Sequence, residues 1–304
     1  MRFFFLALIS TIFVSCSNID NGEIIVDFSD TMSSDMQDVD NGEKAVYVAI
    51  ASMTSPKETY TYYHDLVDYI SKKIDRPIYI RQKETYVEVN EMLEKSEVDF
   101  AFICSGAYAE ESLNGKTKLM VVPVVNERTT YQAYIITHKD SKINKFSDFK
   151  NKSFAFTDPL STTGRLYPLS KLNRLGETES DFFLKTVYTY GHDISIQMVN
   201  RGVIDGASVH SLIYEYTAMH YPERLENTKV IVSSGGFGMP PVVTPSSLDN
   251  DSFDEIRDVF INMNNDSIGR VIIDHLNIDR FDIVGDTLYK SVIKLKEESE
   301  NAEQ

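Results

Sequence analysis

The chain has 304 residues, of which 42% are hydrophobic, which is enough for one large or two ordinary domains with packed cores. Its 46 Asp and Glu outnumber its 30 Lys and Arg, giving a formal net charge of -16 at pH 7. This balance argues against a nucleic-acid-binding surface, because phosphate backbones are bound by clustered cations. Any site for a small anion must therefore be built locally.

The N-terminal stretch MRFFFLALISTIFVSC predicts a secretory signal. Arg2 precedes an apolar run from Phe3 to Val14 that is too short to span a bilayer. Its end, FVSC, resembles a bacterial lipobox, in which the chain is cut before a cysteine that then carries lipid. We predict a lipoprotein signal peptide over residues 1–15 and a lipid anchor at Cys16. The alternative is an ordinary signal peptide or a retained anchor.

Residues 16–44 are acidic and show neither a helical nor a strand pattern, which predicts a flexible tether between the anchor and a folded body. Besides Cys16, the sequence contains one cysteine, Cys104, in FAFICSGAY. If Cys16 carries lipid, no disulfide can form within the chain. Cys104 is then expected to be a small buried hydrophobe.

Regular patterns begin at Ala45 with the apolar strand AVYVAIA. The next segment is helical, because apolar residues recur at spacings of three and four, namely Tyr63, Leu66, Val67, Ile70 and Ile74. Further along, PIYI and VDFAFI predict strands on either side of the helical TYVEVNEMLEKS, and KLMVVPVV and YQAYIITHK continue the alternation. Apolar strands alternating with amphipathic helices predict an α/β fold whose sheet is covered on both faces.

A second series starts with the strand SFAFT. It continues with a helix over about residues 163–175, the strand LKTVYTY, a helix after His192, the strand DGASV, a helix near Tyr214 and the segment KVIVSSGGFGMPPVV. The remainder is mainly helical. We predict two lobes, with lobe 1 formed by residues 45–137 and 240–304 and lobe 2 by residues 138–239. A double crossover near 137–139 and 233–241 would join them and leave a ligand cleft between them.

The segment TDPLSTTGRLYP, residues 157–168, offers the first candidate site. Asp-Pro favours a turn, and Ser161, Thr162 and Thr163 precede an amphipathic helical pattern. One interpretation is an ordinary helix cap. The other is an anion cradle, because the first N–H groups of a helix and nearby hydroxyls can bind an oxyanion without any cation. Pro168 is a complication, since inside a helix it leaves a carbonyl unpaired.

A second cluster lies in YGHDISIQMVNRGVIDGASVHS. His192 and Asp193 precede a helical face, so the imidazole is placed at another helix start, where it can donate to an oxyanion. The neighbouring carboxylate can orient the ring or accept a proton of the ligand. A surface cap is the alternative for both residues. Arg165 and Arg201 are expected to be solvated.

The ordered set DFAFICSGAY, YQAYIITHKDSKI, FTDPLSTTGRLYP and YGHDISIQMVNRGVIDGASV resembles the phosphate-, phosphite- and phosphonate-binding proteins of bacterial ABC importers. The resemblance runs from about residue 45 to about residue 264. It implies a two-lobed periplasmic binding protein of type II. It also implies a lipid-anchored or periplasmic receptor, with no cofactor, that delivers its ligand to a permease and an ATPase.

The resemblance also assigns binding residues. Ser161, Thr162 and Thr163 would hold the oxygens on phosphorus, and His192 would donate from across the pocket. Tyr131 falls where the family has a ligand-contacting tyrosine, and Tyr86 matches a second one from the first lobe, with core packing as the alternative for both.

Two departures from the family bear on the ligand. Family members that bind aminoethylphosphonate use carboxylates to meet its ammonium, and the positions aligned with them here are Leu212 and Met239. We therefore expect phosphate, phosphite or a small alkylphosphonate rather than an aminoalkylphosphonate. Asp193, with Asp205 as the second choice, is the candidate acceptor for the ligand proton that distinguishes phosphate from sulfate.

Two other functions compete with transport. Ser161, His192 and Asp193 or Asp205 supply the elements of a hydrolytic triad, but the sequence has no G-x-S-x-G elbow, and its histidines show no metal-ligand spacing. A sensory receptor of the same fold would hand its closed form to a membrane signalling protein. We expect a monomeric, non-enzymatic binding protein without metal or nucleic acid, exported and facing the periplasm or the cell exterior.

Overall fold

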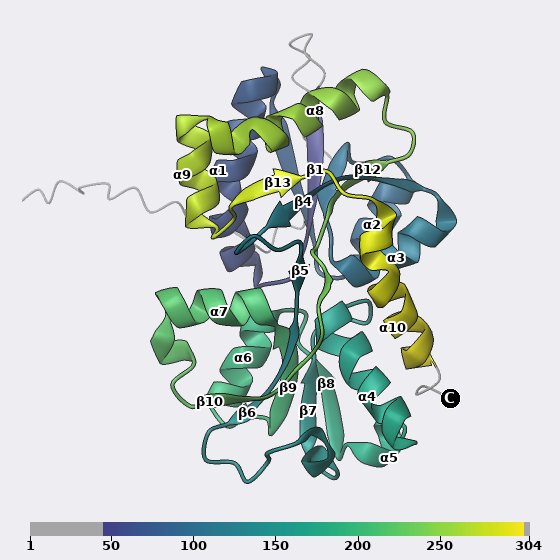
Figure 1. The fold of residues 1–304 in the computed structure, drawn as a ribbon, viewed down its shortest axis with the longest axis vertical. Coiled ribbons are helices and arrows are strands. Elements are labelled where there is room, and N and C mark those ends of the chain that lie inside the picture. The colour runs from purple at the N-terminus through teal and green to yellow at the C-terminus, as the bar shows by residue number, and fades with distance from the viewer. Residues whose placement is uncertain (1–44, 301–304) are drawn as a thin grey trace, which may run out of the picture. The chain divides into compact units, whose positions relative to one another are not determined.

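Two sheets organise the residues that the computed structural model describes, 45–300. The strands in this range are β1 (Val46–Ala51), β2 (Ile78–Lys83), β3 (Phe100–Phe102), β4 (Thr117–Val124), β5 (Thr130–Tyr131), β6 (Ala133–His138), β7 (Ser153–Phe156), β8 (Lys185–Tyr188), β9 (Gly206–His210), β10 (Thr228–Ser233), β11 (Phe237–Gly238), β12 (Val242–Pro245) and β13 (Arg280–Asp282). The first sheet has the order β13-β4-β12-β3-β1-β2 and the second the order β10-β6-β9-β7-β8. The two sheets lie in separate halves of the folded structure formed by these residues (Figure 1).

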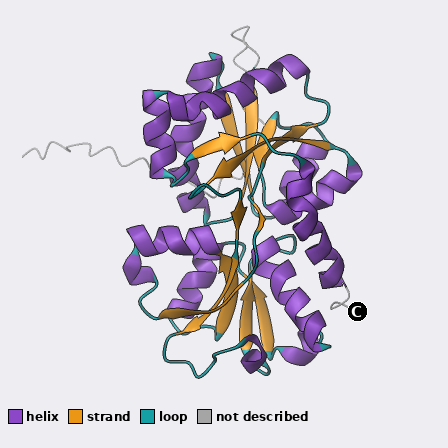
Figure 2. Ribbon diagram, in the orientation of Figure 1, coloured by secondary structure: helices purple, strands orange, loops and turns teal. Residues whose placement is uncertain are grey.

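Helices cover both sheets (Figure 2). The α-helices in the described range are α1 (Pro56–Ile74), α2 (Tyr86–Glu94), α3 (Ser105–Asn114), α4 (Tyr167–Leu175), α5 (Glu179–Phe182), α6 (His192–Asn200), α7 (Ser211–His220), α8 (Asn250–Asn262), α9 (Ser267–His275) and α10 (Lys290–Glu300). The shorter turns are η1 (Phe146–Phe149), η2 (Thr162–Leu166), η3 (Pro222–Arg224), η4 (Met263–Asn265) and η5 (Asp286–Tyr289). The predicted α/β fold is confirmed. The helix α3 and the strand β13 were not predicted, and α9 lies in the C-terminal part that was predicted only as mainly helical.

The chain crosses between the two sheets twice. After β5 it enters the second sheet as β6, which lies between β9 and β10 and is antiparallel to both. After β11 it returns as β12, which lies between β3 and β4 and is again antiparallel to both. The two crossing segments pair with each other, because Tyr131 of β5 is opposite Phe237 of β11. This two-residue ribbon is the point at which the sheets are connected.

The first crossing lies earlier than the predicted lobe boundary between residues 137 and 138. β6 belongs to the second sheet along its whole length, from Ala133 opposite His210 to Thr137 opposite Gly206. The strand pattern of YQAYIITHK was identified correctly, but the pattern of a strand does not say which sheet it joins. The predicted return near residues 233–241 agrees with the interval between β10 and β12.

Residues along β1 alternate between two cores, as expected for a strand covered on both faces. Val48 and Ile50 pack in a cluster with α1, α8 and α9, whereas Ala49 and Ala51 belong to a cluster that contains residues of α2 and α3. The second cluster continues through α10 to α4, which covers the other sheet. One apolar core therefore extends along one side of both lobes.

The predicted signal peptide, the tether and the anchor at Cys16 lie outside the described residues. Among residues 45–300, no helix combines the length and apolar character needed to cross a membrane.

Replacement of Gly206 by alanine is predicted to destabilise the second lobe. An added Cβ would lie 2.1 Å from Cε1 of Phe149 and 2.8 Å from the carbonyl oxygen of Ile136. Both neighbours are fully buried, and overpacking of this kind costs about 1–3 kcal/mol. Urea unfolding should show this loss. Gly235→Ala is the control, because its Cβ would meet no atom within 4 Å, and an equal loss in both variants would contradict the prediction.

Candidate functional site

The segment after β7 forms the predicted turn and helix start. The carboxylate of Asp158 accepts the N–H of Leu160 at 2.8 Å and, from the other lobe, the N–H of Tyr86 at 3.0 Å. The hydroxyl of Ser161 then accepts the N–H of Gly164 at 3.0 Å, as a helix cap does. Ser161 is thus a helix cap, as the first interpretation predicts. The same helix start also lies against the first lobe, as a site between the lobes would require.

The first turn of the helix is unusually wide. The N–H of Leu166 donates to the carbonyl of Ser161 at 2.9 Å, and that of Tyr167 donates to the carbonyl of Thr162, both with π-helical spacing. Such turns are rare and are found often at functional sites. The wide turn also accommodates Pro168, which lies in the first turn of α4.

Hydroxyl groups from both lobes meet at this helix start. The Ser105 hydroxyl, at the first residue of α3, lies 2.8 Å from the Thr162 hydroxyl and 2.8 Å from the Tyr131 hydroxyl. Ser105 was not predicted as a site residue. The sequence does contain a hint of its role. In CSG, as in STTG after β7, a hydroxyl residue and a glycine follow directly after a buried strand. Cys104 is the N-cap residue of α3. It is buried as predicted, and its sulfur lies 4.0 Å from the Thr162 hydroxyl.

Two histidines complete the arrangement. The ring of His210 stacks on Tyr131, with ring centroids 4.0 Å apart. The backbone N–H of His210 donates to Nδ1 of His192 at 3.2 Å. Because Nδ1 of His192 accepts, the neutral ring carries its proton on Nε2 and is a donor there. His210 has the same tautomer, since its Nδ1 accepts the N–H of Leu212 at 3.2 Å.

Several donors in this cluster make no hydrogen bond within the protein. They are the hydroxyls of Tyr86 and Thr163 and Nε2 of His192, although the Tyr86 hydroxyl is near that of Ser161. Tyr86 is 1% exposed, and Thr163 and His192 are 0% exposed. A buried donor without a partner costs about 1–3 kcal/mol. Three such donors in one cluster are therefore typical of a site that binds an acceptor-rich ligand.

The cluster is drawn from both lobes. It contains the predicted residues Tyr86 at the start of α2, Thr162 and Thr163 in η2 and His192 at α6, together with the unpredicted Ser105 at α3. Each helix start carries the positive end of a helix dipole. None of the clustered side chains is Lys or Arg.

Two hydrogen bonds connect the start of α6 to the first lobe. The N–H of His192 donates to the carbonyl of Met53 at 2.9 Å, and Oδ1 of Asp193 accepts the N–H of Ser55 at 2.9 Å. Asp193 therefore lies at the junction of the lobes beside the cluster. Farther from it, Glu58 of α1 pairs with Arg224 at 3.1 Å.

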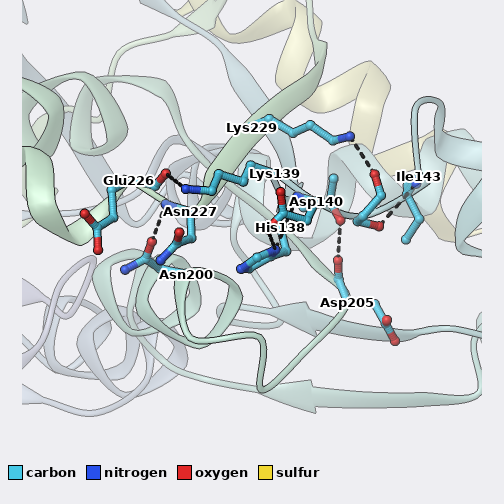
Figure 3. Close-up of polar contacts among 11 residues, drawn as sticks. His138, Lys139, Asp140, Ile143, Asn200, Asp205, Glu226, Asn227 and Lys229 are labelled. Atoms are coloured by element: carbon cyan, nitrogen blue, oxygen red, sulfur yellow. Dashed lines mark hydrogen bonds and ion pairs between the residues drawn. The ribbon is translucent and has the colours of Figure 1, made fainter.

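Asp205 is placed differently. Its carboxylate accepts both the N–H and the hydroxyl of Ser153, at 2.9 and 2.7 Å, and its carbonyl accepts the Thr137 hydroxyl at 2.6 Å. Figure 3 shows it among contacts that hold the far end of the second sheet, near His138 and Lys139. Asp205 therefore has a structural role.

The two arginines named from the sequence also stand outside the cluster. Arg201 is exposed, as expected. Arg165 is only partly exposed and therefore less solvated than predicted, because its Nε donates to the Tyr188 hydroxyl at 2.5 Å.

Burial controls the ionisation of the cluster. It lowers the pKa of His192 to about 3 and that of His210 well below its usual value, so both rings are neutral donors at pH 7. It also raises the pKa values of Asp158 and Asp193. Within residues 45–300, His, Cys, Asp and Glu form no group of three or more that could hold a metal ion.

The family model described as "ABC transporter, phosphonate, periplasmic substrate-binding protein" matches residues 48–289. The Phosphate-import protein PhnD of Mycolicibacterium smegmatis is 27% identical over 165 residues, which is 51% of each chain. The Phosphonates-binding periplasmic protein of Escherichia coli is 25% identical over 226 residues, 72% of this chain and 66% of that protein. The matches thus span about half to two thirds of the length of these relatives.

Solved structures show the same fold. The binding component of an ABC phosphonate transporter from Pseudomonas aeruginosa has a TM-score of 0.79 at 20% identity, covering 84% of this chain and 86% of that one. PhnD1 from Prochlorococcus marinus, solved in complex with methylphosphonate, has a TM-score of 0.77 at 18% identity, covering 85% and 99%. A histidine kinase sensor domain reaches 0.56 at 13% identity, covering 78% and 98%. At these identities the similarities are evidence of fold alone.

The buried histidines are predicted to destabilise the protein as the pH falls. The pKa of His192 is about 3 in the folded protein and about 6.5 in the unfolded chain, so the unfolded chain binds more protons between these values. The free energy of unfolding should therefore decrease by about 1 kcal/mol per buried histidine between pH 7 and pH 5.5. Urea unfolding across this range measures the change.

The variant His192→Gln should lose roughly half of this pH dependence, because His210 keeps its share. An NMR titration gives a second readout, with the urea-unfolded chain as the control. A His192 ring that protonates near pH 6.5 in the folded protein would show the prediction to be wrong.

Proposed function

The chain belongs to the family of periplasmic substrate-binding proteins of phosphonate ABC transporters, and we propose that it binds phosphate, phosphite or a small alkylphosphonate. It would capture this ligand between its lobes and deliver it to a permease and its ATPase. The observation that carries the proposal is the set of buried donors without protein partners on Tyr86, Thr163 and His192. A tetrahedral oxyanion accepts several hydrogen bonds and so fits a cluster of helix starts.

Each residue has a distinct role in the proposed site. Ser161, Thr162 and Thr163 bind the oxygens on phosphorus through hydroxyls and the first N–H groups of their helix. His192 donates from Nε2. Tyr131 and Tyr86 are proposed to contact the ligand through their hydroxyls. The Tyr131 hydroxyl also contacts Ser105, which in turn contacts Thr162.

Asp193 is the proposed acceptor for a proton of the ligand. Phosphate carries such a proton near neutral pH, whereas sulfate does not, so an acceptor favours phosphate. The carboxylate lies beside His192 at the junction of the lobes and binds Ser55 through one oxygen.

The geometry argues against the hydrolase alternative. A serine triad needs a histidine that donates from Nδ1 to a carboxylate and accepts at Nε2. His192 has the opposite tautomer, because Nδ1 accepts the N–H of His210. We propose a binding protein without catalytic activity or cofactor, monomeric, exported and attached to a membrane through lipid on Cys16.

Thr163→Val is predicted to separate binding from stability. The change keeps the shape of the side chain and removes a buried hydroxyl that has no partner, so the free protein should be as stable as before or more stable. A hydrogen bond to a charged ligand contributes about 1.5–3 kcal/mol, so the affinity for phosphate or methylphosphonate should fall about 10- to 100-fold. Calorimetry and urea unfolding measure the two effects.

Thr244→Val is the matched control. The Thr244 hydroxyl is also buried without a partner, but it lies on β12, opposite Lys118 of β4. It should affect stability in the same direction and leave affinity unchanged. Unchanged affinity in Thr163→Val would count against the role of Thr163.

Gly106→Ala is predicted to weaken binding by keeping the lobes apart. An added Cβ on α3 would lie 2.1 Å from the Leu160 carbonyl oxygen and 3.0 Å from the Thr162 hydroxyl, both in the other lobe. Ligand affinity should fall at least about tenfold, and small-angle scattering with ligand should show a less compact form. Gly285→Ala, whose Cβ would come no closer than 3.9 Å to another atom, is the control. Normal closure in Gly106→Ala would refute the prediction.

A further inference from the structure

An apolar cavity of about 180 Å³ lies next to the donor cluster. Both lobes contribute to its wall, and so does the segment after β11 in which the chain returns to the first lobe, residues 239–241. Its apolar lining includes Leu66, Phe102, Leu212, Met239, Ile278 and Phe281.

The cavity and the cluster share residues. His210 lines the cavity and also stacks on Tyr131 and bonds His192. Met53 lines it too, and its carbonyl accepts the N–H of His192. A group attached to a phosphorus atom held by the cluster would therefore lie toward this cavity.

The side chains of the cavity wall favour an uncharged substituent on the phosphorus atom. Among the described residues that line the cavity, none is Asp, Glu, Lys or Arg. Its polar side chains are partly engaged with one another, since the Thr54 and Thr59 hydroxyls lie 3.0 Å apart. The neighbouring carboxylates of Glu58 and Asp193 lie outside the lining and are engaged by Arg224 and by the N–H of Ser55. An ammonium placed here would therefore lose its hydration without a carboxylate in the wall to pair with, which is strongly unfavourable.

The two lobes complete the cavity together. Tyr62 of α1 and Tyr216 of α7 both line it, and their rings meet edge to face with centroids 5.2 Å apart. For size, an engineered apolar cavity of about 150 Å³ is known to take up benzene. The present cavity is thus large enough for a short alkyl chain or a phenyl ring, and far larger than phosphate or phosphite would require beside the cluster.

We propose that this cavity is a subsite for an apolar substituent on phosphorus, so that the preferred ligand is an alkyl- or arylphosphonate of up to about phenyl size. The inference rests on the proposed function of the donor cluster. It extends that function from a phosphorus oxyanion in general to organophosphonates with an uncharged hydrocarbon group.

Calorimetry on the purified full-length protein with methyl-, ethyl-, propyl-, butyl- and phenylphosphonate tests the proposal. Affinity should rise about fourfold for each added methylene until the cavity is filled. Propylphosphonate and 2-aminoethylphosphonate are a matched pair, because they differ by a methyl in place of an ammonium. Propylphosphonate should bind at least about tenfold more tightly.

Variants that fill the cavity give the second readout. Leu212→Trp and, from the opposite wall, Ile278→Phe should reduce the ratio of butylphosphonate to methylphosphonate affinity. Leu184→Trp is the control and should leave the ratio unchanged, because Leu184 is 75% exposed and outside the cavity lining. An unchanged ratio in both filling variants would overturn the subsite.

The outcomes separate the two proposals. If methylphosphonate binds but longer chains bind no better, the apolar subsite is wrong and the oxyanion site stands. If no member of the series and no phosphate binds, both proposals fail.

Discussion

The constraint on which the proposed site depends is that an acidic protein would have to stabilise an anion with no Lys or Arg side chain in the donor cluster. The starts of α2, α3, η2 and α6 meet at the junction of the lobes, each presenting N–H groups that its own helix cannot pair. Fixed dipoles of this kind act over about one helical turn and are little affected by the charge of distant side chains. A net charge of -16 is thus compatible with anion binding.

This arrangement also explains the buried polar groups around it. Asp158 is a buried carboxylate that accepts the N–H groups of Leu160 and Tyr86, and the charge of the nearby Arg165 also favours its ionised form. The two histidines are kept neutral by burial and fixed in one tautomer by backbone N–H groups. Each feature orients a donor toward the cluster, and none leaves a full positive charge there.

The sequence revealed those parts of the protein that are encoded locally. The apolar stripe of α1, the strands and the hydroxyl run at Ser161 all depend on neighbours within a few residues, and the structure agrees with them. Ser105, Asp158 and His210 were missed because their roles arise between distant segments: Asp158 binds Tyr86, 72 residues away, and Ser105 meets Thr162, 57 residues away. The lobe boundary was misplaced for the same reason, because β6 pairs with β9, a strand about 70 residues later in the sequence, and this pairing leaves no local sequence pattern.

The ribbon of β5 and β11 gives Tyr131 a mechanical position unlike that of the other cluster residues. Tyr131 pairs with Phe237 where the chain passes from one sheet to the other, and its hydroxyl contacts Ser105 of the first lobe. When two bodies rotate about a shared axis, points near the axis have the shortest lever arm. Tyr131 would thus change position little as the lobes separate, whereas the contact between Ser105 of α3 and Thr162 of η2, which joins the two lobes, would open. It is suited to be the fixed reference against which both halves of the site are aligned.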